Sequence, residues 1–507
     1  MIGFMAMKQM LRVAAIASIL ATWAYAQAPA PQAPQAPAGR QGQAPGGRGG
    51  QPQGPVATPG VASAADPFPN AIPATEGVIR VNVAEFASLP DAAGVAARIM
   101  HLVQEPGTRR FFVSDMRGVI YRVTEDGKSV TQYLDLNAAG APVQAMGRER
   151  GFQSFAFHPQ FAQQGSRGFG KFYTYIDTTN TMPVADFDPA PGGMDTHHGV
   201  LLEWTAKTPG AAAYDGGPAR ELMRWRDPYQ NHNGGMMAFN PLAQAGAPDF
   251  GLLYIGVADG GSGGDPLNMS QNLAIGFGKM FRIDPLGNDS RNKQYGIPAS
   301  NPFVNRPGAL PEIYAYGLRN PQRLAWDSRN GNLFASDIGQ NIVEEVSIVT
   351  AGANLGWNVW EGSYRFLGNQ GGVGLENPRS DPTVTYPVVE YGQLDPLLQG
   401  QSAAGGLFVY RGNQIPQLAN LLVFADMPSG EIFYVNADRL PAGGQAAIRR
   451  ILLTQNGSTL LQLIQEKNKT QGKMPATRSD LRISMIGPDN RVFLLNKGDG
   501  TIRELTR

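Results

Sequence analysis

Short runs of strand-forming residues that end on a polar residue recur along the chain. Six copies are evident, each closing on Asp or Asn, at residues 111–115, 172–177, 254–259, 333–337, 422–426 and 492–496. Successive closing residues lie between 62 and 89 positions apart, which leaves room for a four-stranded antiparallel sheet and its loops in each copy. The pattern therefore predicts a chain built from a repeated β unit.

Several copies are followed by Gly and a second short strand, at residues 118–121, 430–433 and 500–502. Two strands joined at a glycine are typical of a β-hairpin. Six such sheets packed around an axis form a β-propeller with a central channel. A pair of β-sandwiches or a β-helix would not explain a period of about 75 residues. The predicted fold class is therefore all-β, a six-bladed β-propeller of four-stranded antiparallel blades.

Composition agrees with a turn-rich β protein. The 507 residues include 63 Gly and 39 Pro, and charged residues make up only 16%, which disfavours long helical repeats. A formal net charge of +1 argues against nucleic acid or anionic lipid as a partner. Because the chain has no cysteine, disulfides, Cys-ligated zinc, iron–sulfur clusters, thiol nucleophiles and c-type haem are excluded.

The N-terminal segment predicts export to the periplasm or beyond. Lys8 and Arg12 precede an uncharged stretch, residues 13–26, that ends in Ala-Tyr-Ala, the small-x-small pattern of a cleaved signal peptide. This stretch is too short for a spanning helix, so we expect no stable membrane span. Residues 27–64 are mostly Gln, Ala, Pro and Gly and predict a disordered tether, or alternatively a cell-wall or partner-binding arm. Residues 65–507 then form the propeller.

The densest polar stretch, residues 229–235, places His232 ahead of a short strand, and Asp259 closes the next strand. Antiparallel neighbours joined by a turn at residues 240–250 bring their far ends together. Asp259 could then accept the Nδ1 proton of His232 and leave Nε2 as a base. The alternative is structural, with His232 stabilising a loop and Asp259 binding turn amides.

Two further loops carry candidate chemistry. Arg319 precedes Asn-Pro, a combination that ends a strand, so its guanidinium is expected at a strand end where it could hold a carboxylate or carbonyl oxygen. A structural pin between blades is the alternative. Residues 336–346 run from a strand end into a loop with three carboxylates, and their oxygens suit a hard cation such as Ca²⁺, although the spacing matches no EF-hand.

Several ordered motifs lie at residues 149–152, 156–161, 231–235, 259–266, 278–284, 317–322 and 352–357. Together they resemble the glucose/sorbosone dehydrogenase family, the soluble quinoprotein sugar dehydrogenases, over residues 78–507. The resemblance implies a six-bladed propeller that binds pyrroloquinoline quinone (PQQ) and Ca²⁺ at the channel mouth. It also implies oxidation of the anomeric hydroxyl of an aldose, or of a related sugar or polyol, to a lactone.

The same resemblance implies roles for individual residues. His232 matches the base that takes the hydroxyl proton while hydride passes to the quinone, Asp259 matches the residue that orients it, and Arg319 matches the arginine that polarises the quinone carbonyl. The implied cofactor contacts are Glu149, Gly264, Arg319, Asn320, Ile338 and Arg482. The implied Ca²⁺ ligands are the backbone carbonyls of Gly339 and Gln340.

The chain departs from the family pattern in three places. Residues 425–430 carry no cation where the best-known sugar oxidases of the family place a lysine, and Asp480 stands in place of a second arginine. Gln340 replaces a proline, which matters little if only its carbonyl is used. A tricarboxylate quinone would meet fewer positive charges at these positions, so its affinity could fall.

Two other functions compete with the enzyme. One is a non-catalytic, Ca²⁺-braced propeller that binds a carbohydrate or protein, and the other is a Ca²⁺-dependent lactonase-type hydrolase. The enzyme would act on a small-molecule sugar and pass electrons to a separate acceptor, since the chain has no haem motif. Both a monomer and a homodimer are compatible with the sequence.

The other histidines and the tryptophans are expected to be mainly structural. His101 is assigned to a strand and His158 to a turn, while His197 and His198 are assigned to a loop. Three tryptophans either pack between blades or form a face on which a sugar stacks, namely Trp225, Trp357 and Trp360.

Overall fold

The computed structural model describes residues 66–181, 184–369, 372–454 and 457–507. The predicted signal peptide (1–26) and linker (27–64) lie outside the described residues. Strands dominate the described part, with one α-helix, α1 (Leu460–Thr470), and two short 3₁₀ helices, η1 (Pro396–Leu398) and η2 (Pro416–Leu418). α1 has 11 residues, and none of the helices in these ranges has the length and apolar character needed to cross a membrane.

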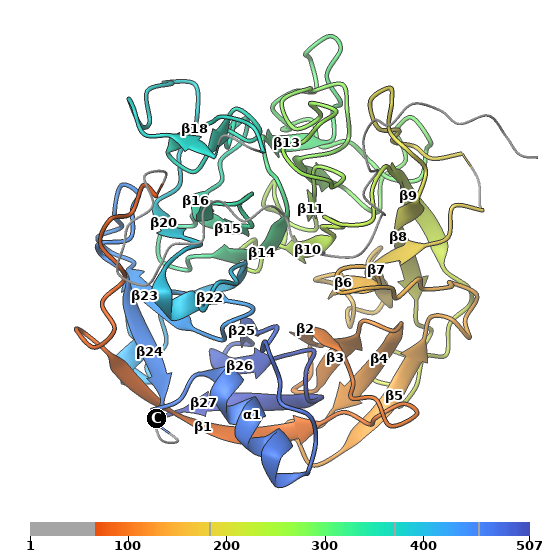
Figure 1. Cartoon of the computed structure of the whole chain (residues 1–507). Coiled ribbons are helices and arrows are strands. Elements are labelled where there is room, and N and C mark those ends of the chain that lie inside the picture. Colours follow the sequence, from red (N-terminus) through yellow and green to blue (C-terminus); the bar gives the residue numbers. More distant parts are fainter. Residues whose placement is uncertain (1–65, 182–183, 370–371, 455–456) are drawn as a thin grey trace, which may run out of the picture. The chain divides into compact units, whose positions relative to one another are not determined.

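Four sheets contain four antiparallel strands each, and we call them blades 1 to 4 (Figure 1). Their strands are β2 (Ile99–Gln104), β3 (Phe111–Asp115), β4 (Val119–Val123) and β5 (Val130–Asp135); β6 (Phe152–Phe157), β7 (Lys171–Thr178), β8 (His197–Thr205) and β9 (Arg220–Asp227); β10 (Met236–Phe239), β11 (Leu253–Val257), β12 (Lys279–Ile283) and β13 (Ile313–Tyr316); and β14 (Pro321–Trp326), β15 (Leu333–Asp337), β16 (Val343–Ile348) and β20 (Val389–Gly392). A small sheet of β17 (Trp360–Glu361), β18 (Tyr364–Phe366) and β19 (Val373–Gly374) is inserted within blade 4.

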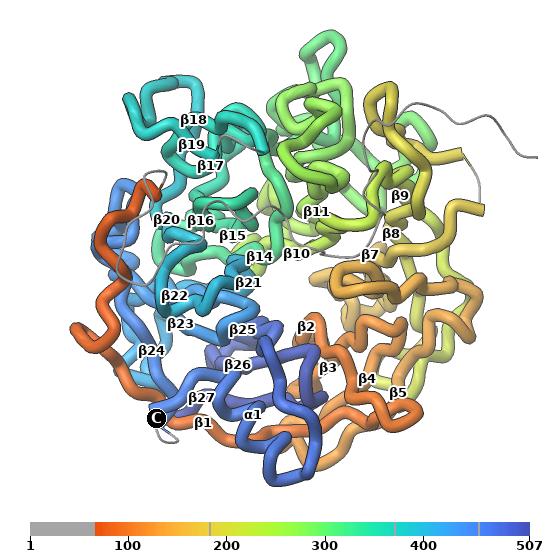
Figure 2. Tube along the Cα trace, in the orientation of Figure 1, coloured from red at the N-terminus to blue at the C-terminus, as the bar shows by residue number. Residues whose placement is uncertain are grey.

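An eight-stranded sheet supplies blades 5 and 6. Blade 5 contains β21 (Ala404–Tyr410), β22 (Leu421–Asp426), β23 (Ile432–Asn436) and β24 (Arg449–Leu453); blade 6 contains β25 (Arg482–Ile486), β26 (Arg491–Leu495), β27 (Thr501–Thr506) and β1 (Ile79–Ser88). β1 pairs antiparallel with β27 and parallel with β24, and Figure 2 shows these segments side by side. The first strand thus completes the last blade and closes the ring.

The first strand of each blade lines the centre of the ring. These inner strands contact one another in the cyclic order β2, β6, β10, β14, β21, β25 and back to β2. In a ring of six, β10 therefore lies across the channel from β25, and β14 lies across from β2. The predicted six-bladed propeller is confirmed.

Each junction between neighbouring blades has its own hydrophobic core. Aromatic and branched side chains from adjacent sheets pack together, for example Phe112 edge-on against Phe157 between blades 1 and 2, and Trp225 tilted against Phe281 between blades 2 and 3. Corresponding clusters occupy the other four junctions, including that between blades 6 and 1. Burial of these faces stabilises the ring by about 25 cal/mol for each Å² of apolar surface removed from water.

The six repeated runs are the second strands of the blades, and their closing acids serve a common structural purpose. Asp177 accepts the Gly151 N–H at 2.7 Å, and Asp426 accepts the Ala403 N–H at 2.9 Å. Each bond fixes the chain where it enters the inner strand of the same blade, and Asp337 does the same in blade 4. Blade 3 is different, because the equivalent acid, Asp259, binds a histidine side chain.

Three predictions for the other histidines have different outcomes. His101 lies in β2 as predicted, and His158 accepts the Gln160 N–H at Nδ1 in a turn, again as predicted. The loop predicted for His197 and His198 is wrong, because these residues begin the buried strand β8. The Gly and Asp residues upstream suggested a loop, whereas pairing with β7 and β9 makes the segment a strand.

Candidate active site at the channel mouth

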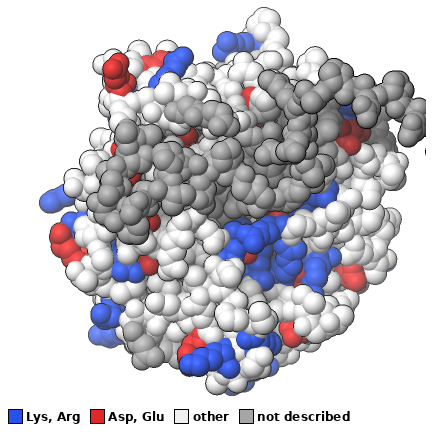
Figure 3. Space-filling view, viewed as in Figure 1, with Lys and Arg blue, Asp and Glu red and all other residues white. Residues whose placement is uncertain are grey.

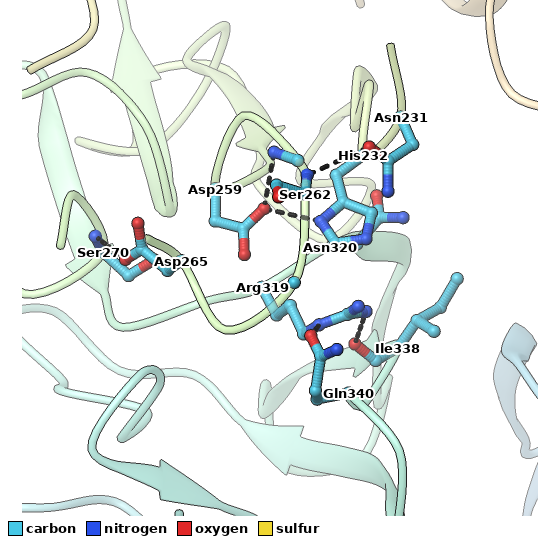
Figure 4. A network of polar contacts seen from close by, with 12 residues as sticks. Asn231, His232, Asp259, Ser262, Asp265, Ser270, Arg319, Asn320, Ile338 and Gln340 are labelled. Carbon is cyan, nitrogen blue, oxygen red and sulfur yellow. Dashed lines mark hydrogen bonds and ion pairs between the residues drawn. The ribbon is translucent and has the colours of Figure 1, made fainter. Parts of the chain in front are cut away.

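His232 and Asp259 meet as the sequence predicts. Antiparallel pairing of Met236 with Gly256 in β10 and β11 brings the loop before one strand to the loop after the other. His232 Nδ1 and Asp259 Oδ1 lie 2.6 Å apart, and both side chains are buried (Figure 4). His232 has a φ of 58°, a left-handed conformation that an L-residue adopts only where surrounding contacts hold it.

Three donors surround the Asp259 carboxylate. Oδ1 accepts from His232 Nδ1 and from the Gly261 N–H at 2.9 Å, and Oδ2 accepts from Trp357 Nε1 at 2.9 Å. Gly261 has a φ of 99°, and a Cβ there would lie 2.3 Å from the Asn231 carbonyl oxygen, so the turn needs glycine. A carboxylate held in this way fixes the Nδ1–H tautomer of His232 and leaves the lone pair on Nε2.

The loop that carries His232 is tied to two other loops. The His232 N–H donates to Glu149 Oε2 at 2.8 Å, and the Ser262 N–H donates to Asn231 Oδ1 at 3.0 Å. Glu149, one of the predicted cofactor contacts, therefore also holds the backbone of His232 in place. The described residues provide no hydrogen-bond partner for His232 Nε2.

Arg319 lies next to this pair. Its backbone carbonyl accepts the Asp259 N–H at 2.8 Å, and its guanidinium carbon lies 5.6 Å from the centre of the Trp357 ring. Nε donates to Gln340 Oε1 at 3.0 Å and Nη1 donates to the Ile338 carbonyl at 2.9 Å. These bonds leave Nη2 without a bond to any described residue. Figure 4 shows the guanidinium and the His232 ring on neighbouring loops.

Asp337, at the end of β15, fixes the backbone where the chain enters β14. Its two carboxylate oxygens accept the N–H groups of Arg319 and Asn320 at 2.8 Å and 2.6 Å. Burial raises the pKa of Asp337 to about 6, although the two N–H groups oppose the shift. The carboxylate therefore positions the Arg319 backbone in its ionised form at neutral pH.

The loop with the predicted Ca²⁺ ligands is organised by one buried carboxylate. Glu361 Oε1 accepts the backbone N–H groups of four consecutive residues, 340–343, at 2.8–3.0 Å. A Cβ on Gly339 would lie 1.5 Å from the Val343 carbonyl oxygen, so the tight bend requires glycine. With the N–H groups directed to Glu361, the described residues donate no hydrogen bond to the carbonyls of Gly339 and Gln340.

This donor set suits a hard cation held by carbonyl oxygens. In the described part of the chain, no three carboxylate or imidazole groups converge in a way that could hold a metal ion. Glu344 and Glu345, two of the carboxylates noted in this stretch of sequence, are buried in β16.

A pocket of about 450 Å³, including the open space at its mouth, lies at the centre of the ring beside these groups. Four predicted cofactor contacts line it, namely Glu149, Asn320, Ile338 and Arg482. His232 and Arg319 adjoin it through their neighbours Asn233 and Asn320. Gly264 does not line the pocket; its N–H donates to Gln340 Oε1 at 3.0 Å and joins the Gly-rich loop to the Gly339–Gln340 bend.

Sequence reasoning missed three cations on the pocket wall, Arg148, Arg478 and Lys497. Met427 and Asp480 also line the pocket, so the two positions where the sequence lacks the family's lysine and second arginine add no positive charge to its wall. Figure 3 shows Lys and Arg side chains gathered near the centre of this face. Arg148 and Arg478 lie in loops that precede inner strands, and Lys497 lies in the loop after β26, the second strand of blade 6.

The three tryptophans are packed inside the protein. Trp225, Trp357 and Trp360 are each at most 4% exposed, so none offers a ring face for sugar stacking in this structure. Trp357 instead bridges two functional groups, because its Nε1 binds Asp259 and its ring lies under Arg319.

A sequence profile of the glucose/sorbosone dehydrogenase family matches residues 99–471. The chain belongs to this family. The family resemblance drawn from the motifs is thereby confirmed, over most of the propeller.

Two relatives and one solved structure define the similarity further. HIPL1 protein of Arabidopsis thaliana is 30% identical over 363 residues, 65% of this chain and 51% of that protein. The human Hedgehog-interacting protein is 29% identical over 321 residues, 63% of this chain and 39% of that protein. The chain spans about half the length, or less, of these curated relatives. The PQQ-bound aldose sugar dehydrogenase of Streptomyces coelicolor has the same fold, with a TM-score of 0.53 at 20% identity over 86% of this chain and 99% of that one.

A buried lysine supports the Gly-rich loop that follows Asp259. Lys279 Nζ donates to the carbonyls of Met269, Ser270 and Phe277 at 2.6–3.0 Å and is fully buried. Burial lowers the pKa of Lys279 to about 7, with the Asp265 charge opposing the shift. Lys279→Met is expected to lower the free energy of unfolding by about 2–4 kcal/mol, because three buried carbonyls lose their hydrogen-bond donor.

The pH dependence of this effect has a defined sign. Between about pH 7 and the ordinary value of 10.5, the unfolded chain binds more protons at Lys279 than the folded chain does. The contribution of Lys279 therefore makes stability rise with pH across that window. Urea unfolding of wild type and K279M should show a stability difference that grows by up to about 1.4 kcal/mol per pH unit. A difference independent of pH would contradict the shifted lysine.

Proposed function

We propose that this chain is a quinoprotein oxidoreductase that oxidises the anomeric hydroxyl of an aldose, or of a related sugar or polyol, to a lactone. The observation that carries the proposal is the 2.6 Å contact of His232 Nδ1 with Asp259 beside Arg319, at a basic pocket in the channel mouth. A base backed by a fixed carboxylate, next to a cation, is suited to removing a proton while negative charge develops nearby.

The residues present are suited to PQQ and Ca²⁺. Arg319 Nη2 and the carbonyls of Gly339 and Gln340 make no hydrogen bond to the described residues, and the pocket wall is rich in cations. When bound, PQQ would supply a two-electron acceptor. Asn320, Ile338 and Arg482 would line its site, and the two carbonyls would hold the cation.

The protein's own contribution is positioning and proton transfer. His232 Nε2 accepts the proton of the anomeric hydroxyl, and Asp259 stabilises the imidazolium that results. Arg319 places a fixed positive charge where negative charge builds up, and Trp357 keeps it close to Asp259. The electrons leave to a separate acceptor molecule, since the chain has no cysteine to attach a c-type haem.

Dye reduction by the reconstituted full chain tests the proposal. The chain is purified without cofactor, loaded with PQQ and Ca²⁺, and assayed against a panel of aldoses and polyols. Sugar-dependent reduction that requires both additions is expected. Tight PQQ binding without turnover on any sugar, or no PQQ binding at all, would count against the enzyme.

A second candidate function is a non-catalytic propeller that binds a carbohydrate or protein. It is favoured by the similarity to HIPL1 protein and to the Hedgehog-interacting protein, whose name states a protein partner. The two functions give opposite results in the assay above. A binding module would not need the buried pair of His232 and Asp259 beside Arg319.

Asp259→Asn tests how the base is oriented. An asparagine presents an N–H₂ group either to His232 Nδ1 or to Trp357 Nε1, both of which donate to the carboxylate in this structure. We expect kcat for aldose oxidation to fall by about 10²-fold or more, with KM changed little, because the wrong tautomer of His232 is favoured. Steady-state kinetics on loaded enzyme would measure it, and unchanged kcat would contradict the orienting role.

We also propose that the activity is located in the periplasm or outside the cell. Support comes from the basic residues and apolar stretch at the N-terminus, which lie outside the described residues. When residues 1–507 are expressed in a bacterial host, cell fractionation with N-terminal sequencing should recover an exported chain that begins near Gln27. Recovery of the intact N-terminus in the cytoplasm would contradict export.

A further inference from the structure

The pocket has two chemically different ends. His232 and Arg319 stand at the entrances to β10 and β14, and these strands lie across the channel from β25 and β2. The far side is formed by residues next to β25 and β26, including Arg482 and Lys497. A flat ligand that spans the pocket would therefore lie beside the loops that carry His232 and Arg319 at one end and meet a group of cations at the other.

Basic side chains outnumber acidic ones on the wall of the pocket. Four basic side chains line the pocket, and only two acidic ones do, Glu149 and Asp480. Arg478 Nε is paired with Asp480 at 2.6 Å, whereas Lys497 Nζ donates to the Arg148 carbonyl at 2.7 Å and to no carboxylate in the described residues. Burial and the neighbouring Arg482 charge lower the pKa of Lys497 well below its ordinary value.

A further buried cation lies directly beneath this wall. Arg323 is 4% exposed, and its Nη1 and Nη2 donate to the carbonyls of Gln322 and Met100, two residues that line the pocket. The Nε atom of Arg323 has no hydrogen-bond partner among the described residues, and no carboxylate among them pairs with this guanidinium. A buried guanidinium without a counter-ion is energetically unfavourable, so its field favours an anion in the space above.

We infer that Lys497, Arg148 and Arg482 form the carboxylate-binding end of the pocket. The inference rests on the proposed function, since the ligand it implies is PQQ with its carboxylates turned away from His232. Lys497 comes from blade 6, and Arg148 precedes the inner strand of blade 2. They supply the positive charge that the sequence lacks at residues 425–430 and at Asp480.

Affinity for PQQ measured with the full chain and Ca²⁺ tests this assignment without relying on turnover. Intrinsic tryptophan fluorescence or calorimetry gives the Kd. R148Q and K497Q are each expected to weaken PQQ binding by about 10-fold, the effect of losing one charge-assisted bond. Arg148 is exposed, so R148Q should fold normally even if K497Q is less stable. K128Q, which alters an exposed lysine in a hairpin turn, is the matched control.

The possible results separate this inference from the proposed function. If wild type binds PQQ and both variants bind it as tightly as K128Q does, the assignment of the carboxylate-binding end is wrong, while the proposed function stands. If wild type does not bind PQQ, the proposed function itself fails. Competition by benzene-1,3,5-tricarboxylate at constant ionic strength supports a carboxylate site. Equal competition by sodium chloride at that ionic strength would overturn it.

Discussion

His232→Asn is expected to lower kcat for aldose oxidation by about 10²–10⁴-fold, the usual contribution of a general base. Asparagine is the appropriate replacement for two reasons. Its Nδ2–H can take the place of Nδ1–H as a donor to Asp259, and asparagine is tolerated at the φ of 58° that His232 adopts. Only the basic Nε2 is then removed. Steady-state dye reduction by PQQ-loaded enzyme measures the change.

The control for this variant is a histidine outside the site. His158 is buried and accepts the Gln160 N–H in a turn, so H158N should keep wild-type kcat where it is folded. PQQ affinity of H232N should stay close to that of wild type, because Nε2 faces the substrate in the proposed mechanism. Wild-type turnover by H232N would mean that another group accepts the proton.

The fold was predictable because the hydrophobic repeat reports local structure. Each copy is a buried second strand that closes on Asp or Asn, and in blades 2, 4 and 5 the closing acid binds N–H groups at the entrance to the inner strand, so the signal recurs once per blade. The closure of the ring was not predictable in this way. β1 pairs with β27, which lies at the other end of the sequence of the domain. The register of this pair depends on contacts between distant residues, and a local sequence pattern does not contain that information.

The same distinction applies to the site. His232 and Asp259 lie on adjacent antiparallel strands, so their meeting follows from chain order alone. Trp357 binds Asp259 from 98 residues away, and Lys497 binds the Arg148 carbonyl from 349 residues away. Such contacts form only because loops from separate blades meet at one channel. To predict them from sequence, one would need to know the order of the blades and how far each loop reaches into the channel.

Comparison of the repeats also shows which closing acid departs from the common structural role. In blades 2, 4 and 5 the closing acid accepts backbone N–H groups at the entrance to the inner strand. In blade 3 the inner-strand entrance instead bonds to β11 through the Gly235 N–H and the Gly256 carbonyl. Asp259 therefore does not bind the N–H groups at this entrance, as its counterparts do, and its carboxylate binds His232 instead.

Glu361→Ala is expected to destabilise the protein by at least about 3 kcal/mol, because four buried N–H groups lose their acceptor. Oε1 of Glu361 accepts from residues 340–343, and the side chain is fully buried. Glu361→Gln keeps the shape and one oxygen but removes the charge, so a smaller loss is expected. Glu376→Ala, at an exposed position in the insertion of blade 4, is the control and should leave stability unchanged.

Calcium binding gives this prediction a second measurement. When the N–H groups of the loop are directed to Glu361, the Gly339 and Gln340 carbonyls are left for a cation. A ligand that binds only the folded state raises its stability in proportion to the logarithm of ligand concentration over Kd. In thermal unfolding with PQQ present, Ca²⁺ should raise the Tm of wild type and E376A but raise that of E361Q much less. Where E361Q still unfolds cooperatively, an equal rise in all three would show that Glu361 stabilises the loop without directing its carbonyls to the metal.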